Sequence, residues 1–310
     1  MIQQWLRTAF SSRKRRVVAN LFVLLLAVGL WCAAQTPADT GWKSVEEAMG
    51  RAGQVQPGDV IRFGMPRKDL HVTLGDVAIK AGLALGSWTA FMHTEHGAMV
   101  MGDLVLTEDE LSPVMRKLQE GGIEIAAVHN HLIGESPHVV YMHISSHGDA
   151  VKMARAIHDA IALTKTPGPD AGAPPTSMEP LGIDQKAIEE TLGRTGKVNG
   201  GILQFGVPRA ESITEAAMVV PPTMGISTAI NFQPTGGGKA AITGDFVLLG
   251  KEVNPVMKAL RDNGIEVSAV HSHMLMEEPR LFFMHFWAND DAAKLAKGLK
   301  AALDLTNSKK

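Results

Sequence analysis

The strongest constraint on the fold is that the chain contains one sequence twice. Residues 102–164 align with residues 244–306 without a gap, and 27 of the 63 aligned positions are identical. Shorter matches continue upstream, so the repeated unit is about 120 residues long. A repeat of that length is a domain rather than one turn of a solenoid. The sequence therefore predicts two copies of one domain in tandem.

Composition marks where the predicted domains begin and end. We expect a first repeat domain at residues 35–165 and a second at residues 183–310. Between them, residues 166–182 are rich in proline and glycine and predict an extended, semi-rigid linker. Residues 1–34 have the layout of a secretory signal peptide, with a basic cluster, an apolar run and small residues at the expected cleavage point.

The predicted signal peptide places the protein in the periplasm or otherwise outside the cytoplasm. Its apolar run is shorter than the roughly 20 residues of a membrane-spanning helix, so the signal or a retained N-terminal anchor is the only expected membrane contact. Cys32 is the sole cysteine, which leaves no disulfide framework and no thiolate ligand after cleavage. Without the five basic residues of the leader, 25 basic residues stand against 32 acidic ones, and such a balance does not favour nucleic acid.

Within each repeat the pattern predicts an α+β domain. In the first copy, apolar strands at residues 97–106, 123–128 and 139–144 alternate with two helices. This order resembles a split βαβ, ferredoxin-like unit, with an antiparallel sheet and its helices on one face. We expect the fourth strand of that sheet to come from the segment around Ile61 and Phe63.

Both copies carry a strand-turn-strand segment with three histidines and a glutamate. The two sets are His129, His131, Glu135 and His143, and, 142 positions later, His271, His273, Glu277 and His285. Side chains two positions apart lie on one face of a strand, so the first two histidines of each set point the same way. Pairing His129 with His143 across the hairpin would bring the third imidazole close to them. Each repeat is therefore predicted to hold one ion on its three histidines.

The residue types indicate which ion this would be. Three imidazoles with an open position are typical of a catalytic zinc site, and histidines with a carboxylate also suit iron or manganese. Zinc is the expected ion, with iron, manganese and copper as alternatives. Glu135 and Glu277 are the expected fourth ligands or general bases. The copper alternative rests on methionines near the histidines, although Met142 and Met284 alternate with the ligand face and are expected in the core.

Two further features accompany the histidines. A Gly-Asp pair recurs ahead of the first helix, as Gly102-Asp103 and Gly244-Asp245. We interpret it as a structural turn or bulge, and the alternative is that the aspartate orients a histidine. The first copy also has four histidines without a counterpart, and this half is the expected active one if only one half is active: His93, His96, His138 and His147.

The recurring phrases also resemble a known family. Gly-Asp-x-Val-Leu, Pro-Val-Met, Gly-Ile-Glu, Val-His-x-His and Met-His together resemble the LppY/LpqO family of exported bacterial proteins, over nearly all of residues 44–306. The resemblance implies an envelope location and two tandem domains of unknown function. It implies no particular activity.

Three functional hypotheses follow from these features. The first is an exported envelope protein that binds a divalent metal and, in its enzymatic version, is a metal-dependent hydrolase. The second is a non-catalytic module in which the histidines are structural and a small-molecule or envelope ligand binds between the repeats. The third is copper or zinc buffering in the periplasm. Whether the chain is an enzyme, and its oligomeric state, stay open.

Overall fold

The computed structural model describes residues 41–169 and 181–309. The predicted signal peptide and most of the predicted linker lie outside these residues. From Ser44 onward the chain forms one compact unit. Among the described residues, no helix combines the length and the apolar character needed to cross a membrane.

The described part of the first repeat consists of three helices and eight strands. The helices are α2 (Lys43–Met49), α3 (Glu108–Glu120) and α4 (Ala150–Ile161). The strands are β1 (Gln54–Gln56), β2 (Val60–Pro66), β3 (Thr73–Leu74), β4 (Val77–Ala78), β5 (Gly86–Thr94), β6 (Gly97–Thr107), β7 (Ile125–His129) and β8 (Val139–Gly148).

The second repeat has the same elements in the same order, with one added 3-10 turn. The helices are α5 (Gln185–Leu192), α6 (Gly250–Asp262) and α7 (Ala292–Leu303), and the turn is η1 (Pro222–Met224). The strands are β9 (Lys197–Asn199), β10 (Ile202–Pro208), β11 (Ile213–Glu215), β12 (Met218–Val220), β13 (Ser227–Gly236), β14 (Lys239–Leu249), β15 (Glu266–His271) and β16 (Leu281–Asp291).

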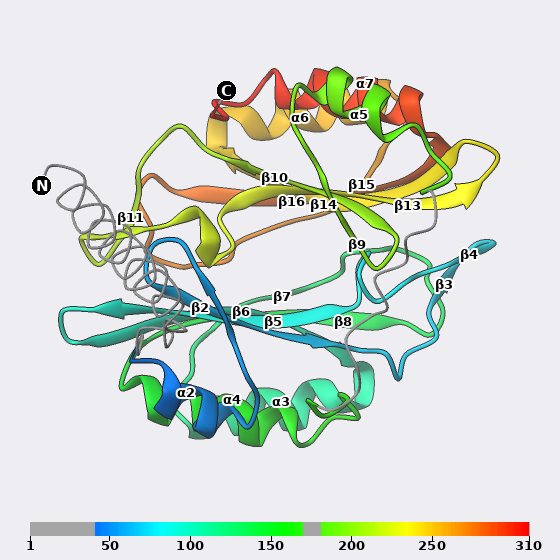
Figure 1. Ribbon diagram of the computed structural model, residues 1–310. Coiled ribbons are helices and arrows are strands. Elements are labelled where there is room, and N and C mark those ends of the chain that lie inside the picture. Colours follow the sequence, from blue (N-terminus) through cyan, green and yellow to red (C-terminus); the bar gives the residue numbers. More distant parts are fainter. Residues whose placement is uncertain (1–40, 170–180, 310) are drawn as a thin grey trace, which may run out of the picture. The chain divides into compact units, whose positions relative to one another are not determined.

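Each repeat has a six-stranded antiparallel sheet, which confirms the predicted α+β class. The strand orders are β1-β2-β5-β6-β8-β7 and β9-β10-β13-β14-β16-β15. Because β8 lies between β6 and β7 and runs antiparallel to both, β6, α3 and β7 form the predicted split βαβ unit. The helices cover one face of each sheet (Figure 1).

The prediction of the fourth strand was wrong in one respect. The strand beside β6 is β5, and β2, which contains Ile61 and Phe63, lies one position further out. Only two residues separate β5 from β6, so the two strands pair as a tight hairpin and occupy adjacent positions.

The faces of the two sheets that carry no helices pack against each other (Figure 1). One apolar cluster joins Val60 and Met101 of the first repeat to Phe283 of the second. Another joins Tyr141 of the first repeat to Ile202 of the second. Both repeats therefore bury the sheet face on which their histidines and Gly-Asp aspartates lie.

Strand alternation decides which residues reach this inner face. In the second repeat, Phe246 and Met284 belong to the apolar core beneath the helices, while their neighbours Asp245 and His285 pair on the opposite side of the sheet. Met142 is fully buried in the equivalent position. The prediction that Met142 and Met284 point into the core is confirmed.

Candidate metal centre

The six predicted histidines meet at the centre of the inner face. His129 and His271 end the edge strands β7 and β15, and they stack with ring centroids 3.7 Å apart. The other four rings also form stacked or tilted pairs, each with one ring from each repeat: His131 with His285 at 3.8 Å, and His143 with His273 at 3.8 Å. The two sets of ligands therefore adjoin in one centre, whereas the sequence predicted a separate site in each repeat.

The predicted hairpin register was wrong by two residues. His129 pairs with Tyr141, and His143 pairs with Ala127. A register shift between Ile125 and Ala127 accompanies this pairing and displaces the strand. The rings of His129 and His143 still approach to 4.9 Å between centroids, because they are diagonal neighbours on one face.

An aspartate joins the histidines of each repeat. The Oδ2 atom of Asp103 lies 3.2 Å from Nε2 of His131, and its Oδ1 lies 3.9 Å from Nε2 of His143. The Oδ2 atom of Asp245 has three imidazole neighbours, Nε2 of His273 at 3.0 Å and Nε2 of His271 and of His285 at 3.9 Å each. Asp103 forms a set of ligand atoms with His129, His131 and His143 that all lie within 4.8 Å of one another.

The sequence pattern did not predict these aspartates as possible ligands. Gly102-Asp103 and Gly244-Asp245 lie inside β6 and β14, in unbroken register with β8 and β16, so the expected turn or bulge was wrong. Their recurrence at the same 142-residue offset as the histidines was the available signal. Register then places Asp103 directly beside His143.

The nitrogen atoms that face the centre have no hydrogen-bond partners. Among the described residues, all six Nε2 atoms of the cluster are buried and unpartnered, as are the Oδ1 atoms of both aspartates. Nδ1 of His143 lies 3.2 Å from the carbonyl oxygen of Gly102, and Nδ1 of His285 lies 2.7 Å from that of Gly244. A carbonyl oxygen only accepts, so each Nδ1 carries the proton and each Nε2 keeps a free lone pair. That tautomer is the one a metal ion requires.

Burial keeps five of the six imidazoles neutral near pH 7. Burial lowers the pKa of His273 and of His285 to about 3, although nearby aspartates oppose it. Burial raises the pKa of Asp245 to about 6, against the effect of His285. Three further histidines have a lowered pKa, through burial first and neighbouring imidazoles second: His131, His143 and His271. Neutral imidazole is the form that binds metal.

The two predicted glutamates are placed differently. Oε1 of Glu135 lies 2.8 Å from Nδ1 of His138 and accepts a hydrogen bond from the backbone N–H of Val139. Glu277 accepts the backbone N–H of Leu281 in the same way. In the described part of the chain, neither glutamate belongs to a group of three or more ligand atoms within 4.8 Å of one another. Both carboxylates instead fix the start of the returning strand.

Replacing Glu135 by alanine is expected to leave metal binding intact while lowering stability. The N–H of Val139 would lose its acceptor, at a cost of about 1–3 kcal/mol. Urea unfolding measures the stability, and elemental analysis measures bound metal. Asp103→Ala is the comparison variant, which is expected to contain less metal than the wild type. Metal loss in Glu135→Ala with retention in Asp103→Ala would reverse the assignment.

The glycine of each Gly-Asp pair is required by close packing. A Cβ atom on Gly244 would lie 1.9 Å from the carbonyl oxygen of Ala229, and one on Gly102 would lie 2.7 Å from that of Trp88. These contacts leave no room for a side chain. The same glycines supply the carbonyl groups that orient His143 and His285.

Gly244→Ala is therefore expected to lower the free energy of unfolding by about 1–3 kcal/mol, as overpacking does in buried strands. Gly206→Ala in the nearby strand β10 is the matched control, because a Cβ there would meet nothing within 4 Å. Urea unfolding midpoints compare the two. Equal midpoints would show that the strands adjust freely at Gly244.

Other candidate features lie away from the centre. The four extra histidines of the first repeat join no group of possible ligands among the described residues. The apolar cluster between the sheets contains four of the methionines on which the copper alternative depends: Met92, Met99, Met101 and Met274.

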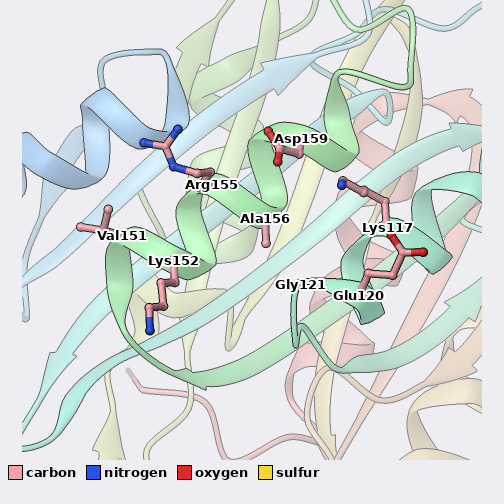
Figure 2. A pocket seen from close by; sticks show the side chains of 8 residues that line it. All are labelled: Lys117, Glu120, Gly121, Val151, Lys152, Arg155, Ala156 and Asp159. Atoms are coloured by element: carbon pink, nitrogen blue, oxygen red, sulfur yellow. The ribbon is translucent and has the colours of Figure 1, made fainter.

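The pocket in Figure 2 lies between α3 and α4, on the helical side, and charged side chains such as Lys117, Lys152 and Asp159 line it. None of its lining residues is a histidine.

A comparison with models of protein families shows the family of this chain. The model for a domain of unknown function, DUF1259, matches residues 43–163 and again residues 186–305. The chain belongs to the DUF1259 family. All eight histidines and aspartates of the centre lie within the matched residues of the two DUF1259 domains.

Comparisons beyond the DUF1259 family add little. The curated proteins contain no match to this chain. Among solved structures, it is similar to the trimeric bacterial microcompartment shell protein PduB, at 13% identity over 83% of this chain and 91% of that one, with a TM-score of 0.22. It is also similar to EtuB from Clostridium kluyveri, at 10% identity over the same shares, with a TM-score of 0.20. Scores this low give no basis for transferring a site or an assembly.

Proposed function

We propose that this protein binds a divalent transition-metal ion, zinc in the first place, in a centre shared by its two DUF1259 domains. One observation carries the proposal: among the described residues, six Nε2 atoms and one oxygen of each of two carboxylates are buried in the same centre without hydrogen-bond partners. Unpartnered polar atoms are costly inside a protein. A histidine cluster that served only packing would use those nitrogens in hydrogen bonds.

The donor set favours zinc over the hard cations. Imidazole nitrogen suits zinc, copper and iron, whereas magnesium and calcium prefer oxygen ligands. Copper buffering through thioethers is less well supported, because Met92, Met99, Met101 and Met274 pack in an apolar cluster and Met276 is exposed to solvent. A ligand bound between the repeats would have to displace the apolar side chains that pack there. The burial of the ligand atoms favours holding an ion over hydrolysing a large substrate.

Elemental analysis of protein purified without a metal-affinity tag tests the proposal. Wild-type protein is expected to contain zinc, and the double variant His129→Ala/His271→Ala is expected to contain none, because it removes the central pair of rings. The matched control is His96→Ala/His147→Ala, which changes two exposed histidines outside the centre. Wild-type protein that binds no transition metal, even after incubation with zinc, would refute the proposal.

We also propose that the protein acts outside the cytoplasm, as the resemblance to the LppY/LpqO family implies. The second support is the signal-like layout of residues 1–34. N-terminal sequencing of protein isolated from its natural host tests this. A mature chain that begins at Gln35 is expected, and an intact Met1 in cytosolic protein would contradict export.

A further inference from the structure

The imidazoles of the centre are arranged in two layers. In the first repeat, the ring of His129 lies 4.9 Å from that of His143, nearly parallel at 6°, and 5.2 Å from that of His131, at 28°. Three rings that bind one ion through nitrogen at about 2.0–2.1 Å have their centres roughly 5 Å apart. The first repeat therefore has the ring spacing of a three-histidine site.

The second repeat builds an equivalent layer. The ring of His271 lies 4.7 Å from that of His285, at 7°, and 5.2 Å from that of His273, at 39°. The pair of His131 and His285 corresponds to the pair of His273 and His143 with the two repeats exchanged, and the pair of His129 and His271 corresponds to itself. The layers are therefore related by a pseudo-twofold axis. Ring centroids in facing layers are only 3.7 to 3.8 Å apart.

Each layer also has its own carboxylate. The contacts from Asp103 to Nε2 of His131 and His143 are 3.2 and 3.9 Å. The contacts from Asp245 to the imidazoles of its layer run from 3.0 to 3.9 Å. Ligand atoms around one tetrahedral zinc ion lie roughly 3.3–3.5 Å apart, as follows from the metal–ligand lengths. The four ligand atoms of the first layer all lie within 4.8 Å of one another, and in the second layer the carboxylate of Asp245 lies within 3.9 Å of all three imidazoles. Two further sets of ligand atoms within 4.8 Å combine both repeats, His129 with His271 and His285, and His143 with His271 and His273, so the two layers adjoin closely.

The number of ligands exceeds what a single ion uses. Six imidazoles and two carboxylates are eight donors, whereas zinc in proteins takes four. One ion would leave about half of the buried nitrogens and carboxylates without partners. Two ions, one per layer, would satisfy every donor, and the two carboxylates would reduce the repulsion between them.

We propose that the centre binds two divalent ions. One would lie on Asp103 with the three histidines of the first repeat, and the other on Asp245 with the three histidines of the second. This inference rests on the proposed function and adds the number and place of the ions. The stacking distance between the layers corresponds to ions roughly 3.5–4 Å apart, the separation found in two-metal sites.

Zinc stoichiometry of the full chain tests the inference. Metal-free protein is loaded with zinc, freed of excess and measured by elemental analysis, and two zinc ions per chain are expected. Asp103→Asn and Asp245→Asn are each expected to retain one ion, and the double variant is expected to retain none. Asp76→Asn, at an exposed carboxylate outside the centre, is the matched control and is expected to retain two.

Paramagnetic copper gives a second readout that does not depend on variants. Two Cu²⁺ ions this close couple their unpaired spins, so fully loaded wild-type protein is expected to show a weak, broadened resonance. Each single aspartate variant is expected to show the ordinary signal of an isolated Cu²⁺ ion. Circular dichroism shows whether each variant folds. If a variant does not fold, the Cu²⁺ resonance and the zinc stoichiometry of the wild-type protein still show whether the centre binds two ions.

The outcomes separate this inference from the proposed function. One ion per chain in wild-type protein, with an uncoupled Cu²⁺ signal, would overturn the two-ion centre and leave metal binding standing. No bound ion would overturn both. Two ions that persist in both Asp103→Asn and Asp245→Asn would overturn the assignment of one aspartate to each ion.

Discussion

Zinc is expected to raise the free energy of unfolding by about 4 kcal/mol for each occupied site when free zinc exceeds the dissociation constant a thousandfold. The ligands span the chain from Asp103 to His285, so the unfolded chain does not present them together. A bound ion also satisfies buried nitrogens that otherwise lack partners. Urea unfolding followed by circular dichroism, in buffered zinc and in a strong chelator, measures the difference.

The variants of the elemental analysis provide the controls for this prediction. His129→Ala/His271→Ala is expected to unfold at the same urea concentration with and without zinc. His96→Ala/His147→Ala is expected to respond like the wild type. If zinc left the wild-type midpoint unchanged, the ion would not be coupled to folding, and the centre could not be its binding site.

Metal-free protein is expected to lose stability steeply as the pH falls below about 6.5. The pKa of His285 in the folded protein is lowered to about 3 by burial, whereas an unfolded imidazole titrates near 6.5. The unfolded chain therefore takes up the proton first, and stability present above pH 6.5 is lost as the pH approaches the folded pKa. Each pH unit below 6.5 lowers the free energy of unfolding by about 1.4 kcal/mol for one such group, so His285 alone lowers it by about 3 kcal/mol at pH 4.5.

Two other titratable groups, His273 and Asp245, change the expected loss of stability in opposite directions. His273 has the same lowered pKa of about 3 and adds a similar loss. The pKa of Asp245 is raised to about 6, so the folded state takes up that proton first and recovers about 2 kcal/mol by pH 4.5. The net loss from these three groups is about 4 kcal/mol, and the lowered pKa values of His131, His143 and His271 add to it.

Urea unfolding of chelated protein at pH 7.5 and pH 4.5 checks this prediction. The variant His273→Gln/His285→Gln has no titrating group at these positions, so its stability is expected to change less between the two pH values. A wild-type protein equally stable at both values would mean that its imidazoles are accessible to protons in the folded state.

Local signals were sufficient to predict the elements around the site. The segment after Thr107 becomes α3 because the carboxylate of Glu110 accepts the backbone N–H of Thr107 at the helix start. Asp149 begins α4 by accepting the N–H of Lys152. Such contacts are only three residues apart, so sequence spacing determines them.

The meeting of the two histidine sets could not be predicted in this way. Periodicity shows which face of a strand is apolar or polar, but not which face of a second domain packs against it. The irregularity between Ile125 and Ala127 also has no marker in the sequence. Continuing the pairing of Ile125 with Ile144 would place Val140 opposite His129, and the irregularity places Tyr141 there instead.

The repetition of a residue in both copies identified the important carboxylates, but it did not distinguish possible metal ligands from residues that bind the backbone. Glu135 and Glu277 recur because each accepts a backbone N–H four residues further on. Asp103 recurs beside a glycine, which suggested a turn, although the glycine lies inside a strand that has no room for a Cβ atom. Only the cross-strand register distinguishes these carboxylates.

The ring pairs have a consequence for how such a chain could arise. Each pair takes one ring from each repeat and is repeated by the pseudo-twofold axis, which is the form of a symmetric homodimer interface. A homodimer must carry the same residue in both halves, but a fused gene can change one half alone. Here the single tyrosine of the chain, Tyr141, stacks on His131, while Phe283 stacks on His273. Two copies of one domain in a single chain can therefore differ in the chemistry that each brings to the shared interface.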